Sequence, residues 1–209
     1  MKIDLFNEIQ NPRPRLEGHE QRRFREAIEQ AKLADDLGYG CWWQVEHHGA
    51  DEFSLSSAPE LLLAAISQQT SRIRLGHSAV LSPGKFNHPI RVAERAATLD
   101  HLSGGRVELG LTRSTSPEWR LFDVDPDDVR SQTQEAFEML PGMWTSERFP
   151  TRAPITGSTT CRSPRNRCSG RIRRCGRPQL APDRSKRRAS AASASWARRC
   201  GSRSTARAG

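Results

Sequence analysis

Apolar and polar residues follow two distinct patterns along residues 3–144. Short apolar runs of the kind that form buried strands occur four times, at 3–8, 41–46, 72–81 and 106–113. Between and after these runs, apolar residues recur every three or four positions, which predicts helices at 19–38, 58–70, 88–105 and from Asp125 toward Trp144. Strand and helix therefore alternate four times, and this order predicts a parallel sheet with helices packed outside it.

Local signals agree with this periodicity where the predicted helices begin and end. Ser57 and Glu60 have the spacing of a capping box, and Pro59 lies in the first turn of the second helix. Pro89 begins the third helix, and the Gly pair at 104–105 ends it. These residues therefore support the boundaries that the apolar spacing predicts.

Two closures of such a sheet are open, a doubly wound open sheet and a barrel. No Gly-x-Gly-x-x-Gly follows the first predicted strand, which argues against a dinucleotide-binding open sheet. Four βα units in residues 1–149 amount to about half of the roughly 250 residues that a (β/α)8 barrel needs. We therefore expect an α/β fold of the (β/α)8 TIM-barrel type, with only the first four βα units present.

Charge divides the chain into two unlike parts. Residues 1–150 contain 17 Lys and Arg against 23 Asp and Glu, a net charge of −6, whereas residues 151–209 contain 16 against one, a net charge of +15. The +9 of the whole chain is therefore a property of its C-terminal part. That part is rich in Arg, Ser, Ala, Gly and Pro and has too few large aliphatic residues to bury a core.

We expect residues 150–209 to be a basic low-complexity tail that is disordered or frameshifted. Arg, Ala, Gly and Pro have GC-rich codons, so GC-rich DNA that is translated in a wrong frame is rich in them, which favours a frameshift near 149–156. The alternative is a genuine basic tail that binds polyanions nonspecifically. Its single aromatic residue, Trp196, offers little for base stacking, so nucleic acid is not an expected partner.

The positions of the histidines and cysteines, together with the short apolar runs, disfavour metal-binding, secreted and membrane-spanning proteins. All six histidines precede residue 102 and no Cys-x-x-Cys occurs, so we expect no metal site. The N-terminus lacks the apolar segment of a signal peptide, and no apolar run approaches the ~20 residues of a membrane span. We therefore expect a cytoplasmic protein without a membrane partner.

Polar residues gather where the predicted strands end. Glu46, His47 and His48 follow the second strand, and Thr112 and Arg113 end the fourth. Each has an ordinary interpretation, a polar rim for the histidine pair and a solvated cation for Arg113. In parallel α/β folds, however, the carboxyl ends of the strands form the site, and several such groups on one edge favour a functional one.

Three segments together resemble the bacterial-luciferase-like flavin monooxygenases. They are EHH at 46–48, IRLGHSAVL at 73–81 and HPIRVAERAATLDHLSGGRVELGLTRS at 88–114. The resemblance is collinear over about residues 1–149. It implies a TIM-like barrel that binds reduced FMN at its C-terminal rim, a separate flavin reductase that supplies this FMN, O2 and a small organic molecule as substrates, and a homo- or heterodimer.

The resemblance also assigns residues. His47 matches a catalytic histidine that helps form and hold the oxygenated flavin. Ser78 and Ala79 match a pair that is joined by a cis peptide bond beneath the flavin ring, and Arg113 matches an arginine that binds the flavin phosphate. Thr112 stands where luciferase has a reactive cysteine, so no thiol chemistry is expected there.

Two further acids complete the expectations that the resemblance carries. Together with Thr112, Glu46 is expected to line the cofactor site, and Glu94 matches a helix acid that stabilises the rim or a dimer interface. Beyond Arg148 the resemblance ends, so the later strands and the loop that completes the phosphate site are not recognisable and we expect impaired activity. The alternatives are a deazaflavin-dependent oxidoreductase and a non-catalytic remnant with a polyanion-binding tail.

Overall fold

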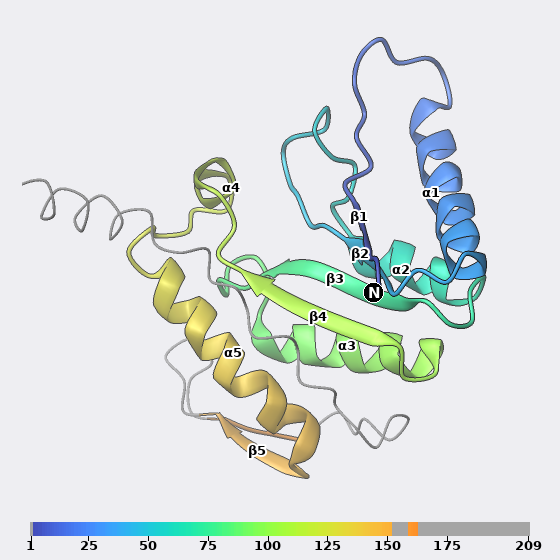
Figure 1. Cartoon of the computed structure of the whole chain (residues 1–209). Coiled ribbons are helices and arrows are strands. Elements are labelled where there is room, and N and C mark those ends of the chain that lie inside the picture. Colours follow the sequence, from blue (N-terminus) through green and yellow to red (C-terminus); the bar gives the residue numbers. More distant parts are fainter. Residues whose placement is uncertain (1, 152–158, 163–209) are drawn as a thin grey trace, which may run out of the picture. The chain divides into compact units, whose positions relative to one another are not determined.

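Four parallel strands form one sheet in the computed structural model, which describes residues 2–151 and 159–162. They pair in chain order and are β1 (Leu5–Asn7), β2 (Cys41–Gln44), β3 (Arg74–Leu81) and β4 (Val107–Thr112), as Figure 1 shows. A helix separates each strand from the next, so the predicted βα alternation with a parallel sheet is confirmed. The strands are shorter than their predicted ranges, because residues such as Glu46 leave the sheet and enter the loops at its edge.

The helices are α1 (His19–Asp36), α2 (Pro59–Ser67), α3 (Pro89–Ser103), α4 (Ser116–Leu121) and α5 (Val129–Thr145). The short helix α4 directly follows β4 and is absent from the sequence-based expectation. The predicted helix start at Asp125 is wrong by four residues, since α5 begins at Val129. Asp125 instead forms a turn, in which its carboxylate accepts a hydrogen bond from the Asp127 N–H at 2.9 Å.

The predicted capping box at Ser57 and Glu60 is also wrong. Ala58, which has no polar side-chain atom, is the N-cap of α2, and the Glu60 carboxylate pairs with Arg95 of α3. The structure has a capping box at α4, between Thr115 and Glu118. The predicted end of α3 is confirmed, since Gly104 adopts the left-handed conformation (φ 68°) that favours glycine at a helix end.

The core lies on the helix-facing side of the sheet. One cluster packs the β2 and β3 side chains Trp42 and Leu75 against α1 and α2, and a second packs Val80 and Leu109 against α3 and α5. Side chains alternate across a strand, so Trp42 is buried to 1% exposure while Trp43 turns to the opposite face.

Gly76 provides the space that Trp43 occupies on that opposite face. A Cβ built on Gly76 would lie 2.1 Å from Cε3 of the Trp43 ring. We expect Gly76→Ala to lower the free energy of unfolding by about 1–3 kcal/mol, because the indole must move out of its packed position. Urea unfolding measures this loss. Gly110→Ala is the matched control, since its Cβ would meet nothing nearer than 3.6 Å; equal losses in both variants would contradict the explanation.

The two outer strands of this sheet, β1 and β4, have no further neighbour among the described residues. A groove of about 290 Å³ runs along β1 and α1, and exposed apolar side chains such as Phe6 and Leu37 line it. A (β/α)8 barrel would place further strands at such edges. The groove is therefore the surface that a closed barrel covers.

Two more strands lie at the start of the region predicted to be a tail, residues 150–209, and the first of them begins two residues before it. β5 (Arg148–Thr151) pairs antiparallel with β6 (Thr159–Arg162) as a separate two-stranded sheet. The rest of the predicted tail, 152–158 and 163–209, lies outside the described residues, so its disorder or frameshift stays a prediction. No helix within the described ranges is long and apolar enough to cross a membrane.

Candidate active site

The structure places all of the predicted site residues toward one edge of the sheet. Because β1 to β4 are parallel, their carboxyl ends meet there (Figure 1). Three consecutive strands contribute the residues, with Glu46 and His47 after β2, Ser78 and Ala79 in the second half of β3, and Thr112 and Arg113 at the end of β4. Glu94 is exposed on α3, and its role stays a prediction.

The His47 ring is held in a fixed orientation. Its Nδ1 lies 3.3 Å from Oε1 of Glu118, and Phe53 packs edge-on against the ring with a centroid distance of 5.1 Å. The His47 backbone N–H donates to the Ser56 carbonyl at 2.9 Å. About a quarter of the side chain (24%) stays exposed. The imidazole is therefore oriented by the protein but still accessible at the rim.

Glu118, the partner of His47, is a buried carboxylate on α4. It accepts hydrogen bonds from the Ser114 hydroxyl at 2.5 Å, the Thr115 hydroxyl at 3.0 Å and the His48 N–H at 3.0 Å. Burial alone would raise the pKa of Glu118, but these hydrogen bonds, first that of Ser114, outweigh it and lower the pKa. Glu118 is therefore ionised at neutral pH.

Glu46 forms a second buried carboxylate centre beside the first. Its Oε1 accepts from Asn87 Nδ2 at 2.8 Å and lies 3.3 Å from His48 Nε2, and its Oε2 accepts from the Leu81 N–H at 3.0 Å. Burial opposes ionisation of Glu46, but the hydrogen bonds of His48 and the other partners outweigh it and lower its pKa. Glu46 thus ties the end of β2 to the end of β3, and its contact with a cofactor stays a prediction.

His77 approaches the same carboxylate from β3. Its Nε2 lies 3.2 Å from Oε2 of Glu46, but the two atoms are not aligned as a hydrogen bond, so the contact is a polar one only. Despite these neighbouring histidines and acids, no group of three or more His, Cys, Asp or Glu is arranged to hold a metal ion within the described part of the chain.

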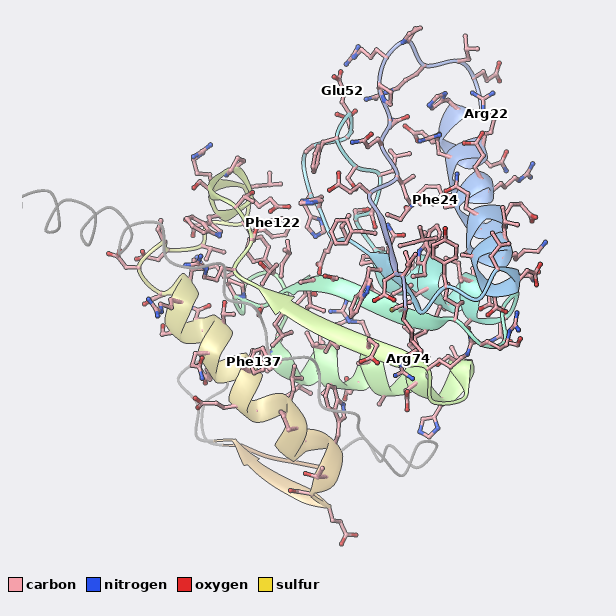
Figure 2. The ribbon with its side chains drawn as sticks, in the orientation of Figure 1. Arg22, Phe24, Glu52, Arg74, Phe122 and Phe137 are labelled. Atoms are coloured by element: carbon pink, nitrogen blue, oxygen red, sulfur yellow. The ribbon has the colours of Figure 1, made fainter. Side chains whose placement is uncertain are left out.

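His48 is the titratable member of the Glu46 centre. Its hydrogen bond to Glu46 raises the pKa of His48 against the opposing effect of burial. Phe122 packs edge-on against the His48 ring, with a centroid distance of 5.1 Å. Figure 2 shows Phe122 near the carboxyl ends of the strands, with Arg74 marking their opposite end. The pKa of His48 is higher in the folded than in the unfolded protein. The hydrogen bond between His48 and Glu46 therefore stabilises the fold fully at a pH below the unfolded pKa of His48, and this stabilisation is lost as the pH rises through the folded pKa.

We therefore expect the free energy of unfolding to fall with pH above about 6.5, the ordinary pKa of histidine, by up to about 1 kcal/mol from this pair. Urea unfolding at a series of pH values measures the slope. His48→Gln should flatten it, whereas His88→Gln, which changes the N-cap of α3, should leave it in place. A slope that persists in His48→Gln would contradict the assignment.

Arg113 presents an unpaired cation at the end of β4. Its guanidinium is exposed and forms no ion pair with any described residue, while its backbone carbonyl accepts a hydrogen bond from Trp119 Nε1 at 2.6 Å. The neighbouring Thr112 carbonyl accepts from the Ser82 N–H at 3.0 Å and its hydroxyl at 2.8 Å, which fixes the strand end. These contacts fix the backbone at the strand end, and a free guanidinium there can bind a phosphate through two parallel hydrogen bonds.

The backbone beside Ser78 and Ala79 is irregular and has little side-chain bulk opposite it. The Ser78–Ala79 peptide bond is cis, as the resemblance implies, and the register of β3 against β4 shifts between His77 and Val80. Gly110 of β4 lies opposite, where a Cβ would be 3.6 Å from that of Ala79. Such register shifts are common next to active sites. Gly110 therefore adds no side chain beside Ser78 and Ala79.

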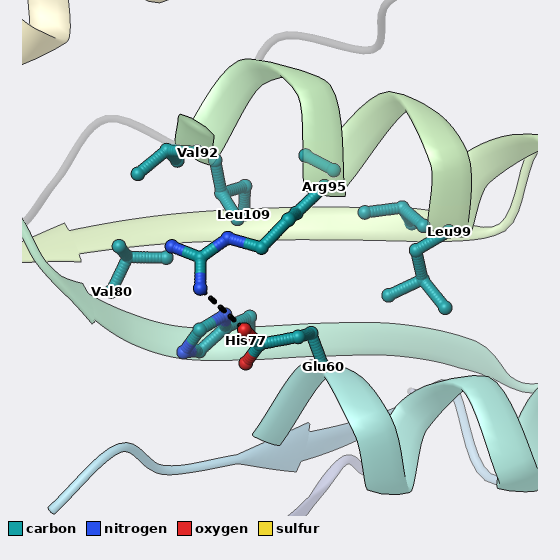
Figure 3. Close-up of a pocket in the computed structure, with 9 residues that line it drawn as sticks. Glu60, His77, Val80, Val92, Arg95, Leu99 and Leu109 are labelled. Carbon is teal, nitrogen blue, oxygen red and sulfur yellow. Dashed lines mark hydrogen bonds and ion pairs between the residues drawn. The ribbon is translucent and has the colours of Figure 1, made fainter. Parts of the chain in front are cut away.

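A small cavity lies behind this edge, between the sheet and helices α2 and α3 (Figure 3). Its volume is about 20 Å³, enough for one water molecule but not for a cofactor. Arg95 crosses it to pair with Glu60 and also donates to Asn87, the residue that contacts Glu46. The cavity therefore belongs to the structural support behind the site.

Sequence reasoning missed two residues of this arrangement, Glu118 and Asn87. A signal for the first was present, since Thr115 and Glu118 have capping-box spacing directly after the fourth predicted strand. Asn87 carries no comparable signal, because it forms its contacts from a loop before α3. The structure therefore adds a carboxylate partner to His47 and an amide partner to Glu46.

Comparison with known proteins identifies the family that this chain matches. The family model for luciferase-like monooxygenases matches residues 1–177, past the point where the recognisable motifs end. The 4-hydroxyprotoasukamycin monooxygenase of Streptomyces nodosus subsp. asukaensis is 39% identical over 126 residues, which are 60% of this chain and 33% of that protein. The oxygenase component of the flavin-dependent trigonelline monooxygenase of Acinetobacter baylyi is 34% identical over 144 residues, which are 68% and 38%.

A solved structure agrees with these relatives. The crystal structure of monooxygenase RslO1 from Streptomyces bottropensis superimposes with a TM-score of 0.69 at 30% identity, covering 78% of this chain and 49% of that one. The chain thus spans about a third of the length of the two curated relatives and about half of the solved structure. With the family model matching most of its length, the chain belongs to the luciferase-like monooxygenase family.

Proposed function

We propose that the protein inserts one oxygen atom of O2 into a small organic substrate with reduced FMN as the cofactor. The observation that carries this proposal is the placement of His47, oriented by an ionised carboxylate, at the same edge as the unpaired Arg113. Bound reduced flavin supplies the two electrons of such a reaction, in which the second oxygen atom leaves as water. The residues at the edge supply binding and proton chemistry.

Each residue fits a part of this cofactor. Arg113 would bind the phosphate, which carries about two negative charges and needs charged donors. The surface at Ser78, Ala79 and Gly110 would lie against the flat ring system. The Thr112 side chain, at the end of the same strand as Gly110, would lie between these two points.

His47 would provide the proton chemistry. With its Nδ1 occupied by Glu118, its Nε2 is left as the acceptor, and this nitrogen has no hydrogen-bond partner among the described residues. A neutral imidazole in that state can take up a proton or hold a hydrogen bond beside the reacting atoms. One relative is named as an oxygenase component. We therefore also propose that a separate reductase supplies the reduced FMN. That the protein acts as a homo- or heterodimer is a separate proposal, which the family resemblance alone supports.

The alternative within the same family is hydride transfer with a deazaflavin. Anaerobic titration of the protein with reduced FMN and with reduced deazaflavin distinguishes the two. We expect reduced FMN to bind, and its reoxidation after oxygen is admitted to be slower than that of FMN in buffer. Binding of the deazaflavin alone, with no effect on the oxygen reaction of FMN, would contradict the proposal.

A further inference from the structure

Two adjacent histidines at the rim are bound by different ring nitrogens to different buried carboxylates. His47 uses Nδ1 toward Glu118 of α4, and His48 uses Nε2 toward Glu46 after β2. The nitrogens without a hydrogen bond among the described residues are therefore opposite ones, Nε2 in His47 and Nδ1 in His48. Two rim histidines with no specific role would not require that each ring present one particular nitrogen to a carboxylate.

The two oxygens of Glu118 have separate tasks. Oε2 accepts from the Ser114 hydroxyl, the Thr115 hydroxyl and the Thr115 N–H, which are the contacts that cap α4. Oε1 takes no part in the cap and instead faces His47 Nδ1 at 3.3 Å and the His48 N–H at 3.0 Å. A carboxylate that only capped its own helix would leave Oε1 to water. The cap therefore serves to aim the second oxygen at the loop after β2.

The charge of Glu118 decides which nitrogen of His47 carries the proton. An ionised carboxylate can only accept hydrogen bonds, so the facing Nδ1 must be the N–H donor. Neutral histidine in water favours the other tautomer, with the proton on Nε2. Phe53 holds the ring from the side, so rotation cannot present the other nitrogen to Glu118 without losing this packing.

We propose that Glu118 is the positioning residue of His47, which keeps the proton on Nδ1 and leaves the Nε2 lone pair available at the rim. The role of Nε2 in the reaction rests on the proposed function, whereas the tautomer itself does not. Glu118 belongs to the segment that directly follows Arg113. The proposal therefore also links the phosphate-binding end of β4 to the orientation of the histidine after β2.

The tautomer is tested by NMR of the full-length protein with ¹⁵N-labelled histidine, without any flavin. At a pH about two units above the ordinary histidine pKa, we expect the His47 ring to carry its proton on Nδ1. The His47→Gln variant assigns the signal. Glu118→Ala should shift the ratio of the two tautomers about tenfold toward Nε2–H, because a charged hydrogen bond is lost.

Two further variants separate positioning from helix capping. Glu118→Gln has a single carbonyl oxygen, so it can keep the cap at the Oε2 position only by placing its NH2 group where Oε1 faces His47 Nδ1. It should therefore fold like the wild type, while the tautomer ratio shifts toward Nε2–H, because an NH2 group donates to Nδ1. Thr115→Ala removes a capping hydroxyl but keeps the carboxylate, and should change the tautomer ratio by less than about twofold. A wild-type ring with its proton on Nε2, or a ratio unchanged in both Glu118 variants, would overturn the proposal.

These results are independent of the proposed function. If the tautomer shifts as expected but reduced FMN neither binds nor reacts differently, Glu118 positions His47 and the flavin assignment fails. If reduced FMN behaves as proposed while the tautomer stays unchanged in the Glu118 variants, the flavin assignment stands and the positioning role fails.

Discussion

Replacing Arg113 by alanine should weaken the binding of FMN by about a hundredfold. The guanidinium is exposed and unpaired among the described residues, while the backbone carbonyl of Arg113 accepts a hydrogen bond from Trp119 Nε1. The guanidinium is therefore free to form two charged hydrogen bonds to a phosphate, each worth about 1.5–3 kcal/mol. The loss of about 2.7 kcal/mol of this interaction corresponds to the hundredfold weaker affinity. Quenching of flavin fluorescence on titration with protein measures it.

Riboflavin and a neighbouring arginine make this test specific. Riboflavin lacks the phosphate, so Arg113→Ala should leave its affinity within about threefold of the wild-type value. Arg120 is exposed on α4, and Arg120→Ala removes the same charge from the same segment, so it should have little effect on FMN. An equal loss for FMN and riboflavin would show that the substitution acts through the fold rather than through the phosphate.

The strand order was predictable because each strand is a short, distinctive feature of the sequence. A run such as Cys41 to Val45 is apolar except for Gln44 because the strand is inside a covered sheet, and this pattern is visible without tertiary information. Helix α4 was not predictable from periodicity, because its six residues are less than two helical turns. The strands β5 and β6 carry no apolar run of this kind.

The candidate site was predictable only as a set of positions. Parallel strands bring His47, Thr112 and Arg113 to one edge regardless of the details of packing. What the sequence does not reveal is the partner of each group. Ser57–Glu60 and Thr115–Glu118 have the same spacing, yet only the second caps its own helix. Glu60 turns to Arg95, 35 residues away, so a tertiary ion pair outcompetes the local one.

The hydrogen-bond partners of Glu46 are likewise not visible in the sequence, and its contact with a cofactor stays a prediction. Its position directly before His47 suggests a site residue, and a carboxylate at a strand end is commonly accessible. In the structure Glu46 is only 6% exposed, and groups from β3, from the loop before α3 and from His48 occupy its oxygens. These partners come from up to 41 positions away in sequence, which local patterns do not report.

Replacing His47 by alanine should leave FMN binding within about threefold of the wild-type value, but should accelerate the unproductive reoxidation of reduced FMN on the protein by about a hundredfold. Under the proposed function Arg113 binds the phosphate, and the only side-chain hydrogen bond of His47 among the described residues is the one to Glu118, so the loss of the imidazole should cost little affinity. The imidazole is instead proposed as the oriented acceptor beside the reacting atoms, and general acid–base groups of this kind contribute about 10²–10⁴ in rate.

Rapid mixing of the reduced complex with oxygenated buffer measures the reoxidation, and hydrogen peroxide measures its unproductive share. His101 lies in the last turn of α3, at the opposite end of the strands, so His101→Ala should reoxidise like the wild type. Traces of His47→Ala that coincide with those of the wild type would exclude His47 from the chemistry.

The Glu118 variants decide how the two residues share this effect. If Glu118 acts only through the His47 ring, Glu118→Ala should accelerate reoxidation in the wild-type background but add nothing in His47→Ala, because the group that it positions is already absent. Residues that act as one unit are strongly non-additive in this way. Additive effects in the double variant would mean that the carboxylate acts on the reaction directly. Glu118 would then be a second, independent site group, even with the His47 tautomer as expected.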